Sequence, residues 1–159
     1  GAKGGGMKST PLLAAALVAI PLTAALAQNE TPAAGITAEQ IVGARQSVMF
    51  LSGGHLTAMK VAVNAGADVR HLYASAMSLA VWARTLPTMF PANSNVPPTN
   101  ARAEVWSDRA GFEAAATAYA EAANGLVAAS LAGDPAVFLE RFNEVRGACA
   151  TCHAAYKND

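Results

Sequence analysis

Apolar residues recur at alternating steps of three and four along most of the chain beyond residue 36. This spacing places them on one face of an α-helix, as in helices that pack into a bundle. Four stretches carry the pattern, at about residues 38–65, 69–86, 101–132 and 135–156. Alanine supplies much of their apolar character, which favours close-packed helices. The pattern therefore predicts an all-α fold, namely an antiparallel four-helix bundle.

Local residues predict where these helices begin and end. Thr37–Gln40 has the order of a capping box, in which two side chains accept hydrogen bonds from backbone N–H groups of the first turn. Asp68 is the N-cap expected for the second helix, and Asp134-Pro135 begin the fourth after a stop at Gly133. Residues 87–100 contain four prolines and predict a long irregular crossover between the second and third helices.

The apolar face of the first stretch carries residues that a plain bundle does not need. Arg45 shares this face with Val42 and Met49, and no acidic residue lies on it. Burying an arginine costs several kcal/mol unless an anion accompanies it, so we expect an anionic ligand nearby. Gly53 and Gly54 each cost the helix about 1 kcal/mol relative to alanine. Close approach of a flat ligand or of a neighbouring helix would account for them.

The N-terminal region predicts export. Residues 7–27 combine a basic start, an apolar run and an A-x-A pattern, which is typical of a secretory signal peptide. The run is too short to span a bilayer, so we expect no stable membrane insertion. Residues 1–6 resemble a vector-derived remnant or an upstream extension, and residues 28–36 a flexible lead-in. The bundle is then expected over residues 37–159, in the periplasm.

Charge and composition narrow the functional classes. The chain has 159 residues, 53% of them hydrophobic and only 6% aromatic, and its formal net charge is zero. This length is enough for one domain with a real core, so disulfides are not needed for stability. No basic run or interleaving of basic and aromatic residues is present, and a nucleic-acid partner therefore has no support.

The chemistry of the chain concentrates near its C-terminus, in Cys149-Ala150-Thr151-Cys152-His153. A C-x-x-C-H segment is the attachment signature of a c-type haem. In a helix, residues three and four apart share one face, so both cysteines and the histidine point the same way. The thiols would bond the haem vinyl groups, and His153 would be the axial iron ligand. We therefore predict one covalently attached haem c.

A haem-free protein is the alternative of another class. A C-x-x-C pair also occurs as a disulfide or as a thioredoxin-like redox pair, but the redox pair expects a βαβ context and a thiol of low pKa. A zinc site would need four ligands, and only His55 and His71 are further strong candidates. The alternative is thus a helical bundle with a disulfide or a bound metal ion.

Further segments resemble one family. Arg45-Gln46-x-x-Met49, Leu86-Pro87-x-x-Phe90-Pro91, Glu104-Val105-Trp106 and the ending from Cys149 to Lys157 are similar to the corresponding parts of the cytochrome c′ family, the class II c-type cytochromes. The resemblance covers about residues 36–156. It implies that Cys149 and Cys152 hold the haem, that His153 is the proximal ligand and that Met49 faces the distal side. It also implies that Arg45 and Gln46 lie near a haem propionate.

The resemblance implies a function in electron transfer, in binding of nitric oxide or carbon monoxide at a five-coordinate haem, or in both. The alternative within the same class is a low-spin electron carrier with Met49 as the sixth iron ligand. Peroxidase-like catalysis would need a distal base, and no His or Asp lies near Met49 on the same helix face. We therefore do not expect this protein to be an enzyme. The redox partner is unknown. A homodimer is also expected, through the faces of the first two helices that point away from the core.

Overall fold

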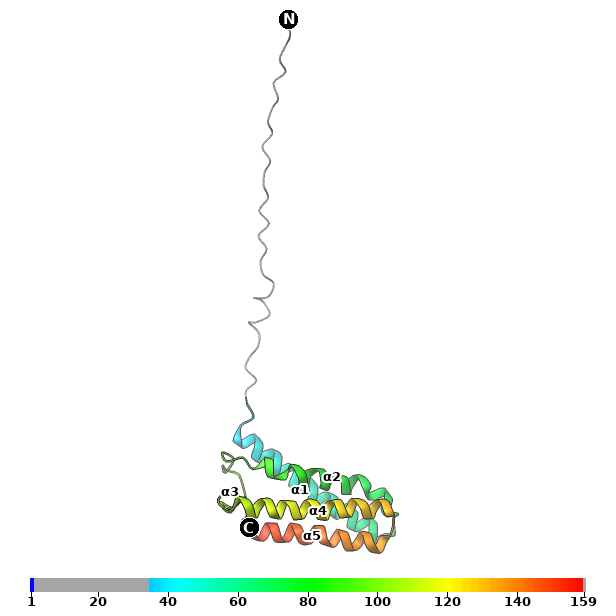
Figure 1. Cartoon of the computed structure of the whole chain (residues 1–159). Helices are drawn as coiled ribbons and strands as arrows, with labels where there is room; N and C mark the ends of the chain where they lie inside the picture. Colours follow the sequence, from blue (N-terminus) through cyan, green and yellow to red (C-terminus); the bar gives the residue numbers. More distant parts are fainter. Residues whose placement is uncertain (2–34, 159) are drawn as a thin grey trace. The chain divides into compact units, whose positions relative to one another are not determined.

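The computed structural model describes residue 1 and residues 35–158, and the folded unit begins at residue 36 (Figure 1). The four long helices are α1 (Ala38–Asn64), α2 (Tyr73–Thr85), α4 (Arg109–Ala132) and α5 (Pro135–Tyr156). Three short helices connect them, η2 (Val69–Leu72), η3 (Leu86–Met89) and α3 (Glu104–Ser107). The predicted four-helix bundle is confirmed. The predicted signal peptide, residues 7–27, lies outside the described residues, as does nearly all of the lead-in.

The predicted caps are present at three helix starts. Gln40 N donates to Thr37 Oγ1 at 3.2 Å and Thr37 N donates to Gln40 Oε1 at 2.8 Å, which completes the capping box of α1. Asp134 Oδ1 accepts from two backbone N–H groups of the first turn of α5. Asp68 also acts as an N-cap, but the turn that it begins is the 3₁₀ helix η2, which leads into α2.

The third helix differs from its prediction. It was expected to run unbroken from about residue 101, whereas α3 ends at Ser107 and α4 starts at Arg109. Asp108 separates them because its side chain caps α4, accepting from Gly111 N at 3.2 Å. The same carboxylate accepts a hydrogen bond of 2.8 Å from the hydroxyl of Tyr156 at the end of α5. A contact with a distant part of the chain thus stabilises the break.

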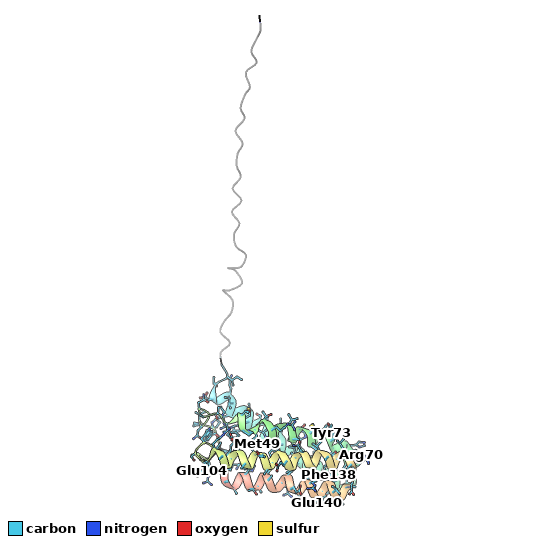
Figure 2. The ribbon with its side chains drawn as sticks, viewed as in Figure 1. Met49, Arg70, Tyr73, Glu104, Phe138 and Glu140 are labelled. Carbon is cyan, nitrogen blue, oxygen red and sulfur yellow. The ribbon has the colours of Figure 1, made fainter. Side chains whose placement is uncertain are left out.

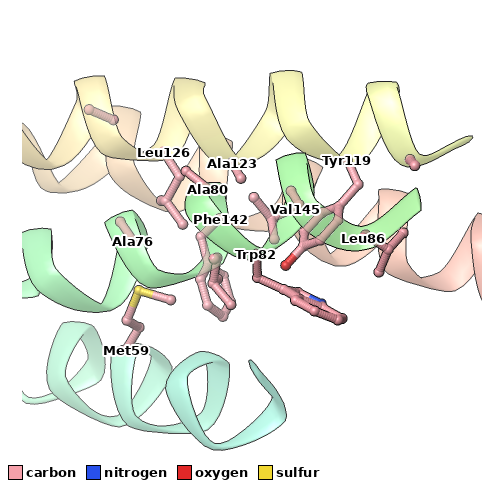
Figure 3. Packing of buried hydrophobic residues seen from close by; sticks show 14 of the residues in the cluster. Met59, Ala76, Ala80, Trp82, Leu86, Tyr119, Ala123, Leu126, Phe142 and Val145 are labelled. Carbon is pink, nitrogen blue, oxygen red and sulfur yellow. The ribbon is translucent and has the colours of Figure 1, made fainter. Parts of the chain in front are cut away.

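Helix α4 is central to the packing, since its most extensive contacts are with α5 and α2. Figure 3 shows part of the buried cluster, in which Met59, Ala76, Leu126 and Phe142 come from four different helices. Helix α1 packs mainly against α2, and its pairing with α5 is minor. Room is therefore left between α1 and α5. No helix among the described residues is both long and apolar enough to cross a bilayer.

Candidate functional site

Two adjoining cavities occupy the room between α1 and α5. The larger has a volume of about 450 Å³ and is lined by α1, the crossover between η3 and α3, the start of α4 and the end of α5. The smaller has a volume of about 130 Å³ and lies further along α1 and α4. Met49, Leu86, Cys152 and His153 line both of them. The larger volume is within the range of cofactor pockets, roughly 300–1,000 Å³.

Helix α5 presents the C-x-x-C-H segment to these cavities. Cys152 faces both and Cys149 faces the smaller one, as their spacing of three residues predicts. Both are free thiols and half-buried. Burial raises the pKa of Cys149, and burial followed by the charge of Cys149 raises the pKa of Cys152. Protonated thiols of this kind do not match a thioredoxin-like pair, which depends on a thiolate of lowered pKa.

The surroundings of His153 favour its neutral imidazole. Burial, and then the positive charge of Lys157 one turn later, lower the pKa of His153. Neutral imidazole keeps a nitrogen lone pair free, and this form binds metals. Lys157 lines the larger cavity beside it. The structure therefore places a basic side chain, Lys157, next to the predicted axial ligand.

Met49 faces the cavities from α1, on the wall across from the C-x-x-C-H segment. Its side chain is half-buried and lines both cavities. Ser52 and Leu56 follow at helical spacing and line the smaller cavity. By contrast, Met59 is fully buried in the apolar core. Figure 2 labels Met49 and Glu104 toward one end of the bundle and Phe138 and Arg70 toward the other.

Arg45 is buried, with 2% of its surface exposed, and lines the larger cavity. Its guanidinium donates to Met89 O, Ser94 Oγ, Ser94 O and Thr99 Oγ1 at 3.2, 2.8, 2.9 and 2.7 Å. All these acceptors are neutral oxygens of η3 and of the crossover that follows it. The hydrogen-bonding groups of Arg45 are thus satisfied within the protein, but these partners carry no charge, and burial lowers the pKa of Arg45. The expected anionic ligand stays a prediction.

Aromatic side chains form one wall of the larger cavity. The ring of Phe112 packs edge-on against Phe90 at 5.0 Å and against Tyr156 at 5.4 Å between centroids. These three rings line the cavity, whereas Trp106 packs behind Phe90 with centroids 6.2 Å apart. The rings of Phe90, Phe112 and Tyr156 make this wall largely apolar.

Sequence reasoning missed two parts of the site. Thr99, Asn100 and Ala101 of the crossover line the larger cavity, and a proline-rich loop offers no periodicity that could have placed them. Tyr119 lines the smaller cavity from α4. Its heptad position was visible in the sequence, but such a position does not distinguish a core residue from a cavity residue. Burial raises the pKa of Tyr119, so its hydroxyl stays protonated.

The remaining histidines lie apart from this chemistry, whereas Gly53 of the glycine pair lines the smaller cavity. His55 Nδ1 lies 3.2 Å from Ser75 Oγ, His71 is exposed, and neither lines a cavity. A Cβ atom added at Gly53 or Gly54 would meet nothing within 4 Å, so no neighbouring helix requires these glycines. Within the described part of the chain, no three His, Cys, Asp or Glu side chains converge to hold a metal ion.

The donor set fits a haem. One wall offers two thiols and a neutral imidazole at the attachment spacing, the opposite wall offers a thioether, and the remaining lining is mostly apolar and aromatic. A flat apolar macrocycle with a central iron needs such surroundings. The fold and the site together define a c-type cytochrome built on a helix bundle.

Comparison with known proteins gives the family. The model of the family described as Cytochrome C' matches residues 40–157. A cytochrome c' from Pararhodospirillum photometricum is 31% identical over 121 residues, covering 75% of this chain and 97% of that relative. One from Rhodospirillum rubrum is 29% identical over 150 residues, covering 93% and 97%. A solved structure, a ferrous variant of cytochrome c prime from Alcaligenes xylosoxidans with bound NO, is 30% identical, with a TM-score of 0.71, covering 77% and 97%.

The chain belongs to the cytochrome c′ family. It is therefore a haem protein with one covalently attached c-type haem. The alternative hypothesis, a haem-free bundle with a disulfide or a metal ion, is therefore wrong. The predicted fold class, cofactor and family are all confirmed.

Proposed function

We propose that this protein is a periplasmic c-type cytochrome whose haem is five-coordinate, and that it binds a diatomic gas, transfers single electrons, or does both. The observation that supports this proposal most is that His153 of α5 and Met49 of α1 line the same two cavities. Bound haem supplies one-electron chemistry and an open iron position. The related structure from Alcaligenes xylosoxidans with bound NO supports gas binding at such a site.

The residues of α5 hold the haem in this proposal. Cys149 and Cys152 would hold the haem, each through a carbon–sulfur bond formed by addition of its S–H group across a vinyl double bond. His153 would coordinate the iron through its neutral imidazole, which burial and then the charge of Lys157 favour by lowering the pKa of His153.

In this proposal the residues of α1 control the space for a ligand at the iron and contact a propionate. Met49, which lines both cavities, would restrict the space for a gas ligand without bonding the iron. Arg45 and Gln46 lie near a haem propionate in this proposal, since Gln46 also lines the larger cavity. In the low-spin alternative, the thioether sulfur of Met49 would instead supply the sixth iron ligand.

We also propose that the protein is not an enzyme. Peroxide cleavage needs a distal acid–base group. Among the described residues that line the cavities there is no carboxylate, and His153 is the only imidazole. The periplasmic location rests on the predicted signal peptide and on the family. Cell fractionation with mass determination of the mature N-terminus tests it.

Homodimerisation through α1 is the remaining proposal for a partner. Phe50, Leu51 and Val61 expose 84%, 60% and 63% of their surfaces on this helix. Exposed apolar residues on one element favour a protein–protein contact. Sedimentation equilibrium of holo-protein should give twice the chain mass, and Phe50→Glu should give the single mass.

Absorption spectra with carbon monoxide test the coordination state. We expect a high-spin ferrous spectrum that shifts when carbon monoxide is added, because an open iron position accepts the gas. A low-spin ferrous spectrum that carbon monoxide leaves unchanged would contradict the five-coordinate proposal and support ligation by Met49. Absence of a covalent haem in the purified mature protein would contradict the whole function.

A further inference from the structure

The hydrogen-bonding capacity of Arg45 is nearly exhausted by the crossover. A guanidinium group carries five N–H donors. Nη1 donates to Met89 O and Ser94 Oγ, and Nη2 donates to Ser94 O and Thr99 Oγ1. All four terminal N–H groups are thus engaged, and only Nε–H remains. A propionate cannot receive the usual forked pair of bonds from this arginine unless the crossover releases it.

The neighbouring contacts hold the same segment. Gln46 Nε2 donates to Pro98 O at 2.8 Å, and the Arg45 guanidinium lies 4.3 Å from the ring centroid of Phe90. Phe90 and Thr99, both contacted by Arg45, line the larger cavity. The consecutive pair on α1 therefore attaches the crossover to the helix and fixes one cavity wall.

The charge of Arg45 has no ionic partner in the protein. Among the described residues no carboxylate lies within ion-pairing distance of it, and Ser94, which accepts two of its hydrogen bonds, is fully buried. Neutral oxygens satisfy the N–H groups but do not cancel the positive charge. In a partly dehydrated site such a charge acts over several ångströms. It disfavours any additional positive charge in the adjacent cavity.

We propose that Arg45 is a positioning residue that holds the crossover as the wall of the haem cavity through its hydrogen bonds, while its charge, which no carboxylate of the described residues balances, favours the ferrous haem. The effect of the charge rests on the proposed function, because it needs the haem. The hydrogen bonding to the crossover does not rest on it. The two roles separate because lysine keeps the charge and loses the planar fork, whereas glutamine loses the charge.

Hydrogen exchange of holo-protein tests whether Arg45 holds the crossover in place. The amides of Ser94, Thr99 and Ala101 donate within the crossover, to Pro91 O, Val96 O and Thr99 Oγ1. In Arg45→Lys their exchange should accelerate by at least about tenfold, since hydrogen bonds to a charged group contribute roughly 1.5–3 kcal/mol. Arg141→Lys is the matched control, because Arg141 bonds only to exposed glutamates of α5. Unchanged exchange in Arg45→Lys would overturn the proposal.

The reduction potential of the haem tests the effect of the Arg45 charge. Arg45→Gln should lower the potential, because the ferric form loses a repelling charge, and it should lower it more than Arg45→Lys, which keeps the charge. Equal shifts in both variants would overturn the role of the charge. The absorption spectrum of each variant shows whether a haem is bound, so loss of the cofactor is distinguished from failure of this inference.

A substitution on the crossover keeps the test usable if changes at Arg45 prevent folding. Ser94→Ala removes one acceptor of the Arg45 fork and leaves the charge in place. The amide of Thr99, which bonds to Val96 O, should then exchange faster, with the potential unchanged. Exchange of Thr99 at the wild-type rate in Ser94→Ala would contradict the proposal.

Discussion

The two ends of the bundle bury their residues by different means. Around the turn between α4 and α5, Phe138, Leu126 and Val69 are fully buried, and the hydroxyl of Ser130 donates to Val69 O at 2.8 Å. This end is a close-packed core. At the other end the helices enclose a cavity of about 450 Å³, and an arginine takes the place of an apolar residue on the buried face of α1.

The difference shows that one periodic pattern can serve two purposes. Met49 and Met59 both lie on the inward face of α1, yet Met49 lines the cavities and Met59 is fully buried. At the packed end, neighbouring side chains supply the contacts that stabilise burial. At the cavity end, hydrogen bonds from α1 to the crossover hold the wall in place, and the haem supplies the missing contacts. The predictions below test this division.

The largest effect is expected at the attachment residues. Replacing both Cys149 and Cys152 by alanine should abolish covalent haem attachment, because no thiol is left to bond a vinyl group. Mass spectrometry of the denatured chain should then give the mass of the polypeptide alone. Thr151→Ala is the matched control between them and should keep the haem. A covalent haem in the double variant would refute the assignment.

The next effect belongs to the packed end. Phe138→Ala should destabilise the holo-protein by about 3–5 kcal/mol, because it leaves a cavity in a close-packed core. Guanidinium unfolding measures the change, and the haem spectrum of the folded variant should match the wild type. Val137→Ala is the control, since Val137 is 39% exposed and its loss should cost less than about 0.5 kcal/mol. A changed haem spectrum in Phe138→Ala would mean that the two ends are coupled.

A moderate effect is expected at Met49. Met49→Ala should raise the affinity for carbon monoxide by on the order of tenfold, since it removes a side chain that restricts the ligand position. Carbon monoxide titration of the ferrous protein measures this. Met77→Ala, a half-buried methionine on α2 that lines neither cavity, should leave the affinity unchanged. Equal effects of the two substitutions would argue against a distal role for Met49.

The smallest effect separates two adjacent glycines. Gly54→Ala should stabilise the holo-protein by about 0.5–1 kcal/mol, because alanine suits a helix interior and its Cβ atom meets nothing within 4 Å. Gly53→Ala should gain less, because Gly53 lines the smaller cavity and its new methyl group would approach the haem. Thermal unfolding of both variants gives the comparison. Equal stabilisation would mean that the haem does not reach Gly53.

Much of the fold was predictable because its signals are local. The helices α1 and α5 follow from periodicity and from caps such as Thr37 and Asp134, which act within three residues of their partners. The spacing in C-x-x-C-H is local in the same sense, so the haem could be predicted without a fold. The break between α3 and α4 could not, since the contact of Asp108 with Tyr156 joins residues 48 positions apart.

By itself, the sequence determined the helices, the attachment residues and the presence of a buried arginine on α1. Only the tertiary structure decided what each buried position faces. The partners of Arg45 lie 44 to 54 residues away, in a crossover without periodicity. Helical period specifies which residues point inward, but the distance between two helices specifies whether they meet a neighbour or a cavity. That distance depends on the packing of the whole chain, which no local pattern encodes.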